Sequence, residues 1–169
     1  MDNMLKDCKT YYGAIDIGSN AVRLLIKCVE EDEQGKVFFS KVLLLRVPLR
    51  LGFDVFAMGK ISETKEKNML RLMKVFHHLM KIYDVEDYRA CATSAMRDAK
   101  NGKDIIKRIK KKTGIRIEII DGQEEAKMIY NNHIECMEDR NGNYMYVDVG
   151  GGSTEINLLS QGELVCSRS

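Results

Sequence analysis

The sequence has few residues that break or crosslink a chain. Its 169 residues include one proline and no tryptophan, so a proline-rich linker is excluded. No run of about 18 apolar residues occurs, which excludes a membrane-spanning helix. The five cysteines are odd in number and none lies in a C-x-x-C pair, so we expect reduced, mostly buried thiols and no zinc site. Because residues 1–10 lack the apolar core of a secretory signal, we expect a cytoplasmic protein.

The sequence also lacks a large excess of charge of either sign. Lys and Arg number 27 against 25 Asp and Glu, a net charge of +2, and 44% of the residues are apolar. This is the balance of an ordinary globular protein. It does not indicate a nucleic-acid partner. The basic run Lys107–Lys112 is interpreted as the solvated face of a helix.

Glycines mark the boundaries of the first strands. Apolar patterns predict strands at Tyr11–Ile17, at Ala21–Val29 and over Val37–Phe39, with the third strand signal resuming at Val42–Val47. Short turns join these segments, so they form an antiparallel three-strand meander.

Helices and strands alternate after the meander. Ser62 is typical of a helix N-cap, and apolar residues at helical spacing extend to Tyr83. The remaining patterns predict a strand at Asp87–Thr93, helices at Ala95–Ala99 and Asp104–Thr113, a strand at Ile115–Ile120, a helix from Asp121 to about Met137, and strands at Tyr144–Val149, Ile156–Leu159 and Leu164–Cys166. This order predicts an α/β fold with a mixed sheet and flanking helices.

Two segments far apart in the chain share one design. Ala14–Asn20 and Tyr146–Gly152 each contain an apolar strand, an Asp, an apolar residue and a glycine turn. Two ordinary hairpins remain an alternative, because Asp and Gly favour turns for local reasons. A run of three glycines before Ser-Thr-Glu, however, exceeds what a turn requires.

The functional interpretation of this pair is a phosphate site. Glycine allows the backbone to approach a ligand, and successive amides form an anion-binding concavity. Hydroxyls of Ser19, Ser153 and Thr154 add donors. If the hairpins face each other across a cleft, Asp16 and Asp148 form a carboxylate pair. Such a pair suits a hydrated Mg²⁺, which prefers oxygen ligands.

The paired hairpins resemble the phosphate loops of the superfamily of actin, sugar kinases and heat-shock chaperones. Within it, the sequence is most similar to the exopolyphosphatase and guanosine pentaphosphate phosphohydrolase (Ppx/GppA) family. The resemblance rests on four segments in the expected order, with a weaker match at 50–52: Ala14–Leu24, Ala92–Arg97, Ile120–Ala126 and Val147–Glu155. The Glu-Glu-Ala sequence in the third segment distinguishes this family from the kinases.

The resemblance implies a ribonuclease H-like (actin-like ATPase) fold with two similar domains. We expect the first at residues 1–121 and a truncated second at 122–169, because members of the family are longer than this chain. It also implies a Mg²⁺-dependent hydrolase that removes terminal phosphate from inorganic polyphosphate or guanosine pentaphosphate. A homodimer is expected, with no membrane partner.

The resemblance also assigns roles to residues. Glu125 would be the general base that activates water, Glu155 would orient water or metal, and Arg97 would contact the phosphate chain. Asp16 and Asp148 would face the metal. The phosphate cradle would comprise Gly18, Ser19, Asn20, Gly150, Gly151, Gly152, Ser153 and Thr154.

Other interpretations stay open at this stage. Glu125 could be an ordinary first-turn acid favoured by the helix dipole, and Arg97 a surface arginine. Glu124 is expected to cap its helix together with Asp121. A non-catalytic sensor of polyphosphate or alarmone nucleotides would use the same loops, as would an ATP-using kinase of the superfamily.

Overall fold

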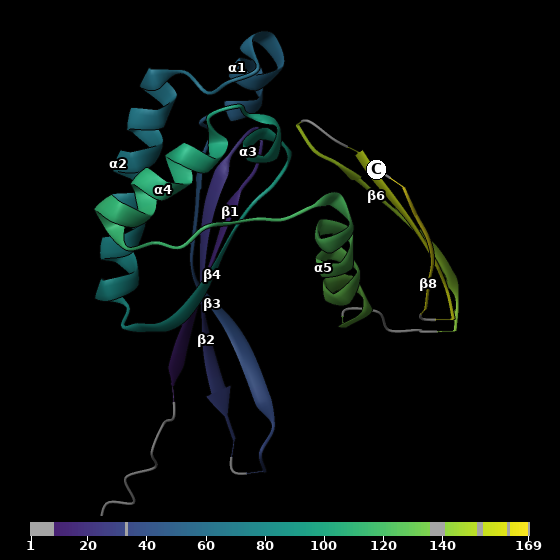
Figure 1. Cartoon of the computed structure of the whole chain (residues 1–169). Coiled ribbons are helices and arrows are strands. Elements are labelled where there is room, and N and C mark those ends of the chain that lie inside the picture. The colour runs from purple at the N-terminus through teal and green to yellow at the C-terminus, as the bar shows by residue number, and fades with distance from the viewer. Residues whose placement is uncertain (1–8, 33, 136–140, 152–153, 162, 169) are drawn as a thin grey trace, which may run out of the picture.

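The structure is a computed structural model that describes residues 9–32, 34–135, 141–151, 154–161 and 163–168. It contains two separate sheets, with helix α5 between them (Figure 1). Cys8 and Cys136 lie outside the described residues. The other three cysteines are free thiols, but only Cys28 is buried, while Cys91 and Cys166 are half-buried. The prediction of mostly buried thiols is therefore wrong for these two.

The first sheet combines the predicted meander with parallel strands. Antiparallel pairs join β1 (Thr10–Ile17), β2 (Val22–Glu31) and β3 (Val37–Val47). Strand β4 (Val85–Ala92) runs parallel to β1, and β5 (Glu118–Ile119) runs parallel to β4. The strand order is β3-β2-β1-β4-β5. This mixed sheet confirms the predicted fold class. Because β1 and β4 are parallel, their last residues, Ile17 and Ala92, lie side by side at the same end of the sheet.

Four helices cover one face of this sheet (Figure 1). They are α1 (Leu51–Met58), α2 (Glu63–Ile82), α3 (Ser94–Asp98) and α4 (Gly102–Thr113). Helix α2 begins after Ser62, whose hydroxyl accepts a hydrogen bond from the Lys65 amide at 3.4 Å, as its N-cap position predicts. Its buried side chains pack with those of the central strands in one core, which includes Met69, Met73, Phe76, Ile15, Ile17, Leu24 and Ile26.

Helix α1 was not predicted from the sequence. Arg50 at its N-cap has a left-handed backbone with φ 51° and makes no side-chain cap hydrogen bond. The start therefore carries none of the Ser, Thr, Asp or Asn signal that marks a helix N-terminus. Strand β5 is shorter than the predicted Ile115–Ile120, because only Glu118 and Ile119 pair with β4. The isoleucines around them are buried by packing rather than by the strand ladder.

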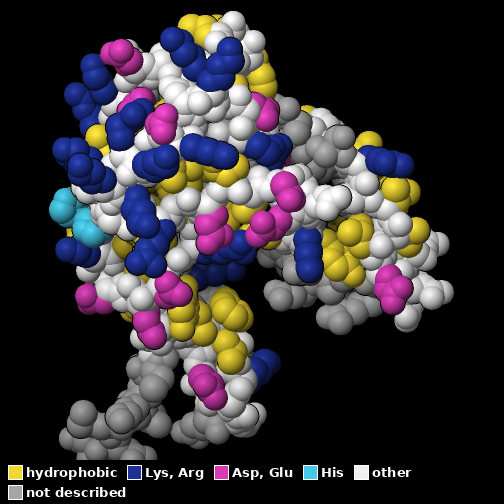
Figure 2. Space-filling view, viewed as in Figure 1, with side chains coloured by type: hydrophobic (Ala, Val, Ile, Leu, Met, Phe, Trp, Pro, Cys, Tyr) yellow, Lys and Arg dark blue, Asp and Glu magenta, His cyan; other side chains and the backbone are white. Residues whose placement is uncertain are grey.

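The basic run in α4 lies on the surface. Lys107, Arg108 and residues 110–112 are exposed, whereas Ile109 is buried. Figure 2 shows basic side chains over α2 and α4 with acidic ones among them. This arrangement confirms the solvated helix face predicted for residues 107–112.

The second sheet is a separate meander. Strands β6 (Asn143–Val149), β7 (Thr154–Ser160) and β8 (Glu163–Arg168) pair antiparallel in that order. Helix α5 (Gly122–Glu135) contacts β7 and β8. The first sheet ends at Ile119 and the second begins at Asn143; the domain boundary at residue 121 stays a prediction. Among the described residues, no helix is both long and apolar enough to span a membrane.

Asp54 connects α1 to the start of α2. Its carboxylate accepts a hydrogen bond from the Ser62 amide at 3.0 Å and pairs with Lys65 Nζ at 2.7 Å. Burial raises the pKa of Asp54, but the hydrogen bonds from Lys65 and Ser62 outweigh it, so the net shift is downward. The ionised form is therefore the one that stabilises the fold.

We expect Asp54→Asn to lower the free energy of unfolding by about 1–3 kcal/mol at pH 7. Because the folded pKa is lowered, this contribution is complete above the unfolded value of about 3.9 and is lost as pH falls through the folded pKa. Urea unfolding of both proteins between pH 3 and pH 7 measures the difference. Asp104→Asn is the matched control, since Asp104 is an exposed first-turn acid with a 3.8 Å ion pair. An equal loss in both variants would contradict the role of Asp54.

Gly102 permits close packing between α3 and α4. A Cβ added there would lie 2.2 Å from the Met96 carbonyl oxygen, which is backbone and cannot rotate away. We expect Gly102→Ala to destabilise the fold by at least about 2 kcal/mol. Gly114→Ala is the control, because a Cβ there meets nothing within 4 Å and only the φ of 78° is unfavourable. Thermal unfolding measures both, and a smaller loss at Gly102 than at Gly114 would contradict the close packing inferred at Gly102.

Candidate active site

The two glycine turns meet in space. The first follows β1, where the Gly18 amide donates to the Ala21 carbonyl at 3.1 Å and closes the hairpin. The second follows β6 and includes Gly151. A Cβ added at Gly151 would lie 3.2 Å from Asn20 Cβ and 3.5 Å from Ser19 Cβ. The turns are therefore in van der Waals contact, as the matching design of the two hairpins predicts.

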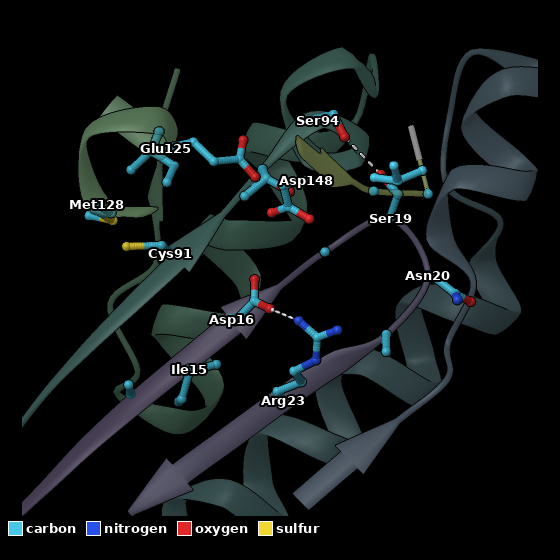
Figure 3. A pocket seen from close by; sticks show the side chains of 18 of the residues that line it. Ile15, Asp16, Ser19, Asn20, Arg23, Cys91, Ser94, Glu125, Met128 and Asp148 are labelled. Atoms are coloured by element: carbon cyan, nitrogen blue, oxygen red, sulfur yellow. Dashed lines mark hydrogen bonds and ion pairs between the residues drawn. The ribbon is translucent and has the colours of Figure 1, made fainter. Parts of the chain in front are cut away.

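A cleft of about 530 Å³ lies beside this contact. Both turns, strands β1 and β4 and helix α5 contribute to its wall. In Figure 3 the carboxylates of Asp16, Asp148 and Glu125 point into it from three different elements. The lining residues that matter for the chemistry are Asp16, Gly18, Ser19, Asn20, Arg23, Arg89, Glu125, Asp148, Gly150 and Gly151.

The first turn is held from outside by several hydrogen bonds. The Ser19 carbonyl accepts from the Gly52 amide and the Asn20 carbonyl from the Arg50 amide, both at 2.8 Å. The buried Ser19 hydroxyl lies 2.8 Å from the Ser94 hydroxyl at the start of α3. These contacts make the turn a rigid wall. Because the Gly18 amide is used within the turn, its role as a phosphate donor stays a prediction.

Asp16 is paired with an arginine that was not among the predicted site residues. The hairpin register places Asp16 opposite Arg23, and Arg23 Nη1 donates to Asp16 Oδ2 at 2.8 Å. Burial raises the pKa of Asp16, Arg23 lowers it, and the charge of Asp148 raises it again, leaving a net upward shift. The two predicted metal-side carboxylates are thus close enough to repel each other.

The donor set fits a hydrated Mg²⁺ ion. Among the described residues, no group of three His, Cys, Asp or Glu side chains gathers as a metal site. Asp16 and Asp148 both line the cleft, from different strands, with carboxylate oxygens of the kind that Mg²⁺ prefers. Mg²⁺ keeps several waters and uses one or two carboxylates together with substrate phosphates. Its binding there stays a prediction.

Helix α5 places Glu125 in the cleft. The Asp121 carboxylate accepts a hydrogen bond from the Glu124 amide at 2.8 Å, and the Asp121 carbonyl accepts one from the Glu125 amide at 3.0 Å. Asp121 therefore caps the helix as expected. The Glu124 carboxylate does not complete the cap, because it binds Arg89. Glu125 lines the cleft and its Oε2 atom is buried.

Arg97 hydrogen-bonds the backbone just before helix α5. Its Nη1 donates to the Ile120 carbonyl at 2.9 Å. Arg97 is absent from the described residues that line the cleft. This hydrogen bond holds the backbone immediately before the Asp121 cap. A direct contact between Arg97 and a phosphate chain stays a prediction.

The second turn is described in part. Gly150 and Gly151 line the cleft and are exposed. Thr154 is exposed at the start of β7, and the described lining does not include it. Gly152 and Ser153 lie outside the described residues. Glu155 pairs with Asp148 in the ladder of β6 and β7, and its side chain lies outside what the structure describes.

Several lining residues were not predicted from the sequence, and Arg23, Arg89 and Cys91 are among them. Arg23 could have been found, because a tight hairpin after Ile17 fixes the register that sets it opposite Asp16. Arg89 and Cys91 required the parallel pairing of β4 with β1, which is non-local. Burial raises the pKa of Cys91, so this residue is a thiol rather than a thiolate at neutral pH.

Comparisons with known proteins give related phosphatases. A bifunctional 3-dehydroquinate synthase/phosphatase of Fusobacterium nucleatum is 33% identical over 148 residues, which cover 86% of this chain and 22% of that protein. Exopolyphosphatase 1 of Mycobacterium tuberculosis is 28% identical over 145 residues, which cover 86% of this chain and 41% of that protein. The chain therefore spans less than half the length of these two relatives.

Solved structures have the same fold. The crystal structure of the Aquifex aeolicus Ppx/GppA family member has a TM-score of 0.79 and 29% identity, and the match covers 95% of this chain and 50% of that one. An exopolyphosphatase from Cytophaga hutchinsonii has a TM-score of 0.83 and 27% identity, with 94% and 49% covered. The model of the Ppx/GppA phosphatase family matches residues 28–169. The chain therefore belongs to the Ppx/GppA phosphatase family.

Proposed function

We propose that the whole protein is a Mg²⁺-dependent hydrolase that releases the terminal phosphate of inorganic polyphosphate or guanosine pentaphosphate. The observation that carries this proposal is the cleft in which three carboxylates from three elements face two converging glycine turns. Membership in the Ppx/GppA phosphatase family and the similarity to exopolyphosphatases support it.

The charges of the cleft favour a cation together with the substrate. Asp16, Asp148 and Glu125 face it against Arg23 and Arg89, and both arginines already pair with carboxylates. A phosphate chain alone would meet net repulsion there. A cation between the phosphate chain and the Asp16–Asp148 pair removes this repulsion. The two carboxylates that would hold Mg²⁺ are therefore also the groups whose negative charge it would offset.

The chain's own residues perform the remaining steps. Glu125 takes the proton from water as the water attacks the terminal phosphorus, while the bridging P–O bond breaks and the shortened chain leaves with its oxygen. Arg23 supplies a guanidinium beside Asp16 and offsets charge on the phosphate oxygens. The glycine turns let the backbone approach the phosphate chain. When bound, Mg²⁺ supplies charge neutralisation at the transferring phosphate.

The two substrates present the same terminal anhydride to this cleft. Phosphate release from a polyphosphate of defined length and from guanosine pentaphosphate, each with and without Mg²⁺, therefore tests the function of the whole protein. Tight binding without release would favour the sensor, and phosphate transfer from ATP to a sugar or acid would favour the kinase. A cytoplasmic location and a homodimer stay predictions.

We expect Glu125→Gln to lower kcat by about 10²–10⁴-fold, because an amide cannot accept the proton from water. Substrate affinity should change little, since Gln is nearly isosteric and Glu125 is not a phosphate ligand in this proposal. Phosphate release at saturating substrate and calorimetric binding of polyphosphate with Mg²⁺ measure the two effects. Glu63→Gln is the control, because Glu63 is 91% exposed on α2. Wild-type turnover of Glu125→Gln would place the base elsewhere.

We expect Asp148→Asn to raise the Mg²⁺ concentration that gives half-maximal activity by about tenfold or more, because fewer ligand charges weaken binding of a hard cation. Saturating Mg²⁺ should restore much of the activity. A Mg²⁺ titration of phosphate release measures both. An unchanged Mg²⁺ requirement would show that Asp148 is not a metal-side carboxylate.

A further inference from the structure

Helix α5 packs against the second sheet, and an ion pair joins its first turn to the first sheet. Its body contacts β7 and β8 of the second sheet. Its first turn, however, reaches Arg89 on β4 of the first sheet. The general base of the proposed reaction lies in this same first turn. The position of Glu125 in the cleft therefore depends on how the start of α5 is fixed.

Arg89 makes a three-way ion pair at this junction. Its Nη2 atom donates to Glu124 Oε1 at 2.6 Å and to Glu118 Oε2 at 3.2 Å, while Nε lies 3.3 Å from the same Glu118 oxygen. Glu118 belongs to β5 and Glu124 to α5. The planar guanidinium thus joins β4, β5 and α5 through one group.

The contacts continue from Glu124 to Glu125. Glu124 is the residue before the base, and its amide is held by the Asp121 carboxylate at 2.8 Å. The Glu125 amide is held by the Asp121 carbonyl at 3.0 Å. Arg89 on one side and Asp121 on the other therefore fix the peptide unit that carries Glu125. Hydrogen bonding by Glu124 and Glu118 raises the pKa of Arg89, so the cation persists at any working pH.

Stability does not account for this cluster. The side chains of Arg89, Glu118 and Glu124 are 52%, 62% and 45% exposed. Ion pairs between such half-exposed groups contribute little to the free energy of folding. Geometry is the property they do control, and displacing a catalytic group by about 1 Å costs on the order of 10²-fold in rate.

We propose that Arg89 is a positioning residue that holds the first turn of α5 against the first sheet through Glu124 and thereby sets the place of Glu125 in the cleft. The inference rests on the proposed function for its catalytic readout. Arg89 also lines the cleft, so a direct contact with the phosphate chain is the competing explanation that the experiment must separate.

The test compares three variants of the whole protein. Arg89→Gln and Glu124→Ala each remove one side of the ion pair and should each lower kcat by about 10-fold to 100-fold with KM changed less than about twofold. The double variant should lose no more than either single variant, because both act through one contact. Arg89→Lys keeps the charge but not the fork, so it should recover part of kcat.

Arg108→Gln is the matched control. Arg108 is 51% exposed and forms a two-bond ion pair with Glu66, at 2.6 and 2.9 Å, between α4 and α2. The Arg108→Gln substitution removes an arginine of nearly the same exposure as Arg89, at a position that does not line the cleft. We expect it to leave kcat and KM unchanged.

Hydrogen exchange gives a readout that needs no activity. The amides in a peptide spanning residues 121–130 should exchange at least about fivefold faster in Arg89→Gln and in Glu124→Ala than in Arg108→Gln, because the first turn opens more often. Unchanged exchange in both variants would overturn the positioning role. The exchange test is independent of activity. If the wild-type protein released no phosphate from any substrate, that result would overturn the proposed function alone.

Two kinetic outcomes would also overturn the inference while leaving the proposed function intact. The first is wild-type kcat in Arg89→Gln. The second is a raised KM in Arg89→Gln with normal kinetics in Glu124→Ala, which would make Arg89 a direct phosphate ligand. If Arg89→Gln fails to fold, Glu124→Ala and its exchange data still decide.

Discussion

The site depends on the van der Waals contact between two glycine turns that lie more than a hundred residues apart. Gly151 approaches Asn20 and Ser19 so closely that a Cβ would stand 3.2 Å from the Asn20 side chain. A Cβ at Gly151 would require the neighbouring atoms to shift by a few tenths of an ångström. Asp16 and Asp148 each stand two residues before a turn glycine. The absence of a side chain at Gly151 thus permits the close approach of the two turns that follow these carboxylates.

In the proposed function, those carboxylates repel the phosphate chain that the two glycine turns would bind. Burial and the neighbouring Asp148 both raise the pKa of Asp16, and only Arg23 opposes them. Three carboxylates therefore face two arginines beside the glycine turns. In the proposed function, such a site would bind a free polyanion weakly and a polyanion with a divalent cation more strongly. In the proposed function, this requirement selects the metal-bound form of the substrate.

The sequence predicted the meander, α2, the Asp121 part of the α5 cap and the convergence of the turns, because each depends on local patterns or on a repeated motif. It missed α1, whose start at Arg50 has no capping side chain. It missed Arg23 and Arg89, because their roles follow from strand pairing. Arg23 faces Asp16 across a hairpin. Arg89 reaches Glu118, which lies 29 positions later in the chain on a parallel strand. Charged residues that act through register carry no motif of their own.

Two arginines, Arg97 and Arg89, hold the start of α5, although the sequence predicted only a phosphate contact for Arg97 and no role for Arg89. Arg97 holds the carbonyl of Ile120, before the cap of α5, and Arg89 holds Glu124, after it. Asp121 lies between these two anchors and caps the helix. The helix start is therefore joined to α3 and to β4 on either side of its cap, while its body contacts β7 and β8. In the proposed function, these contacts keep Glu125 in the cleft with Asp16, because Arg89 on β4 and Arg97 on α3 both hold the start of α5.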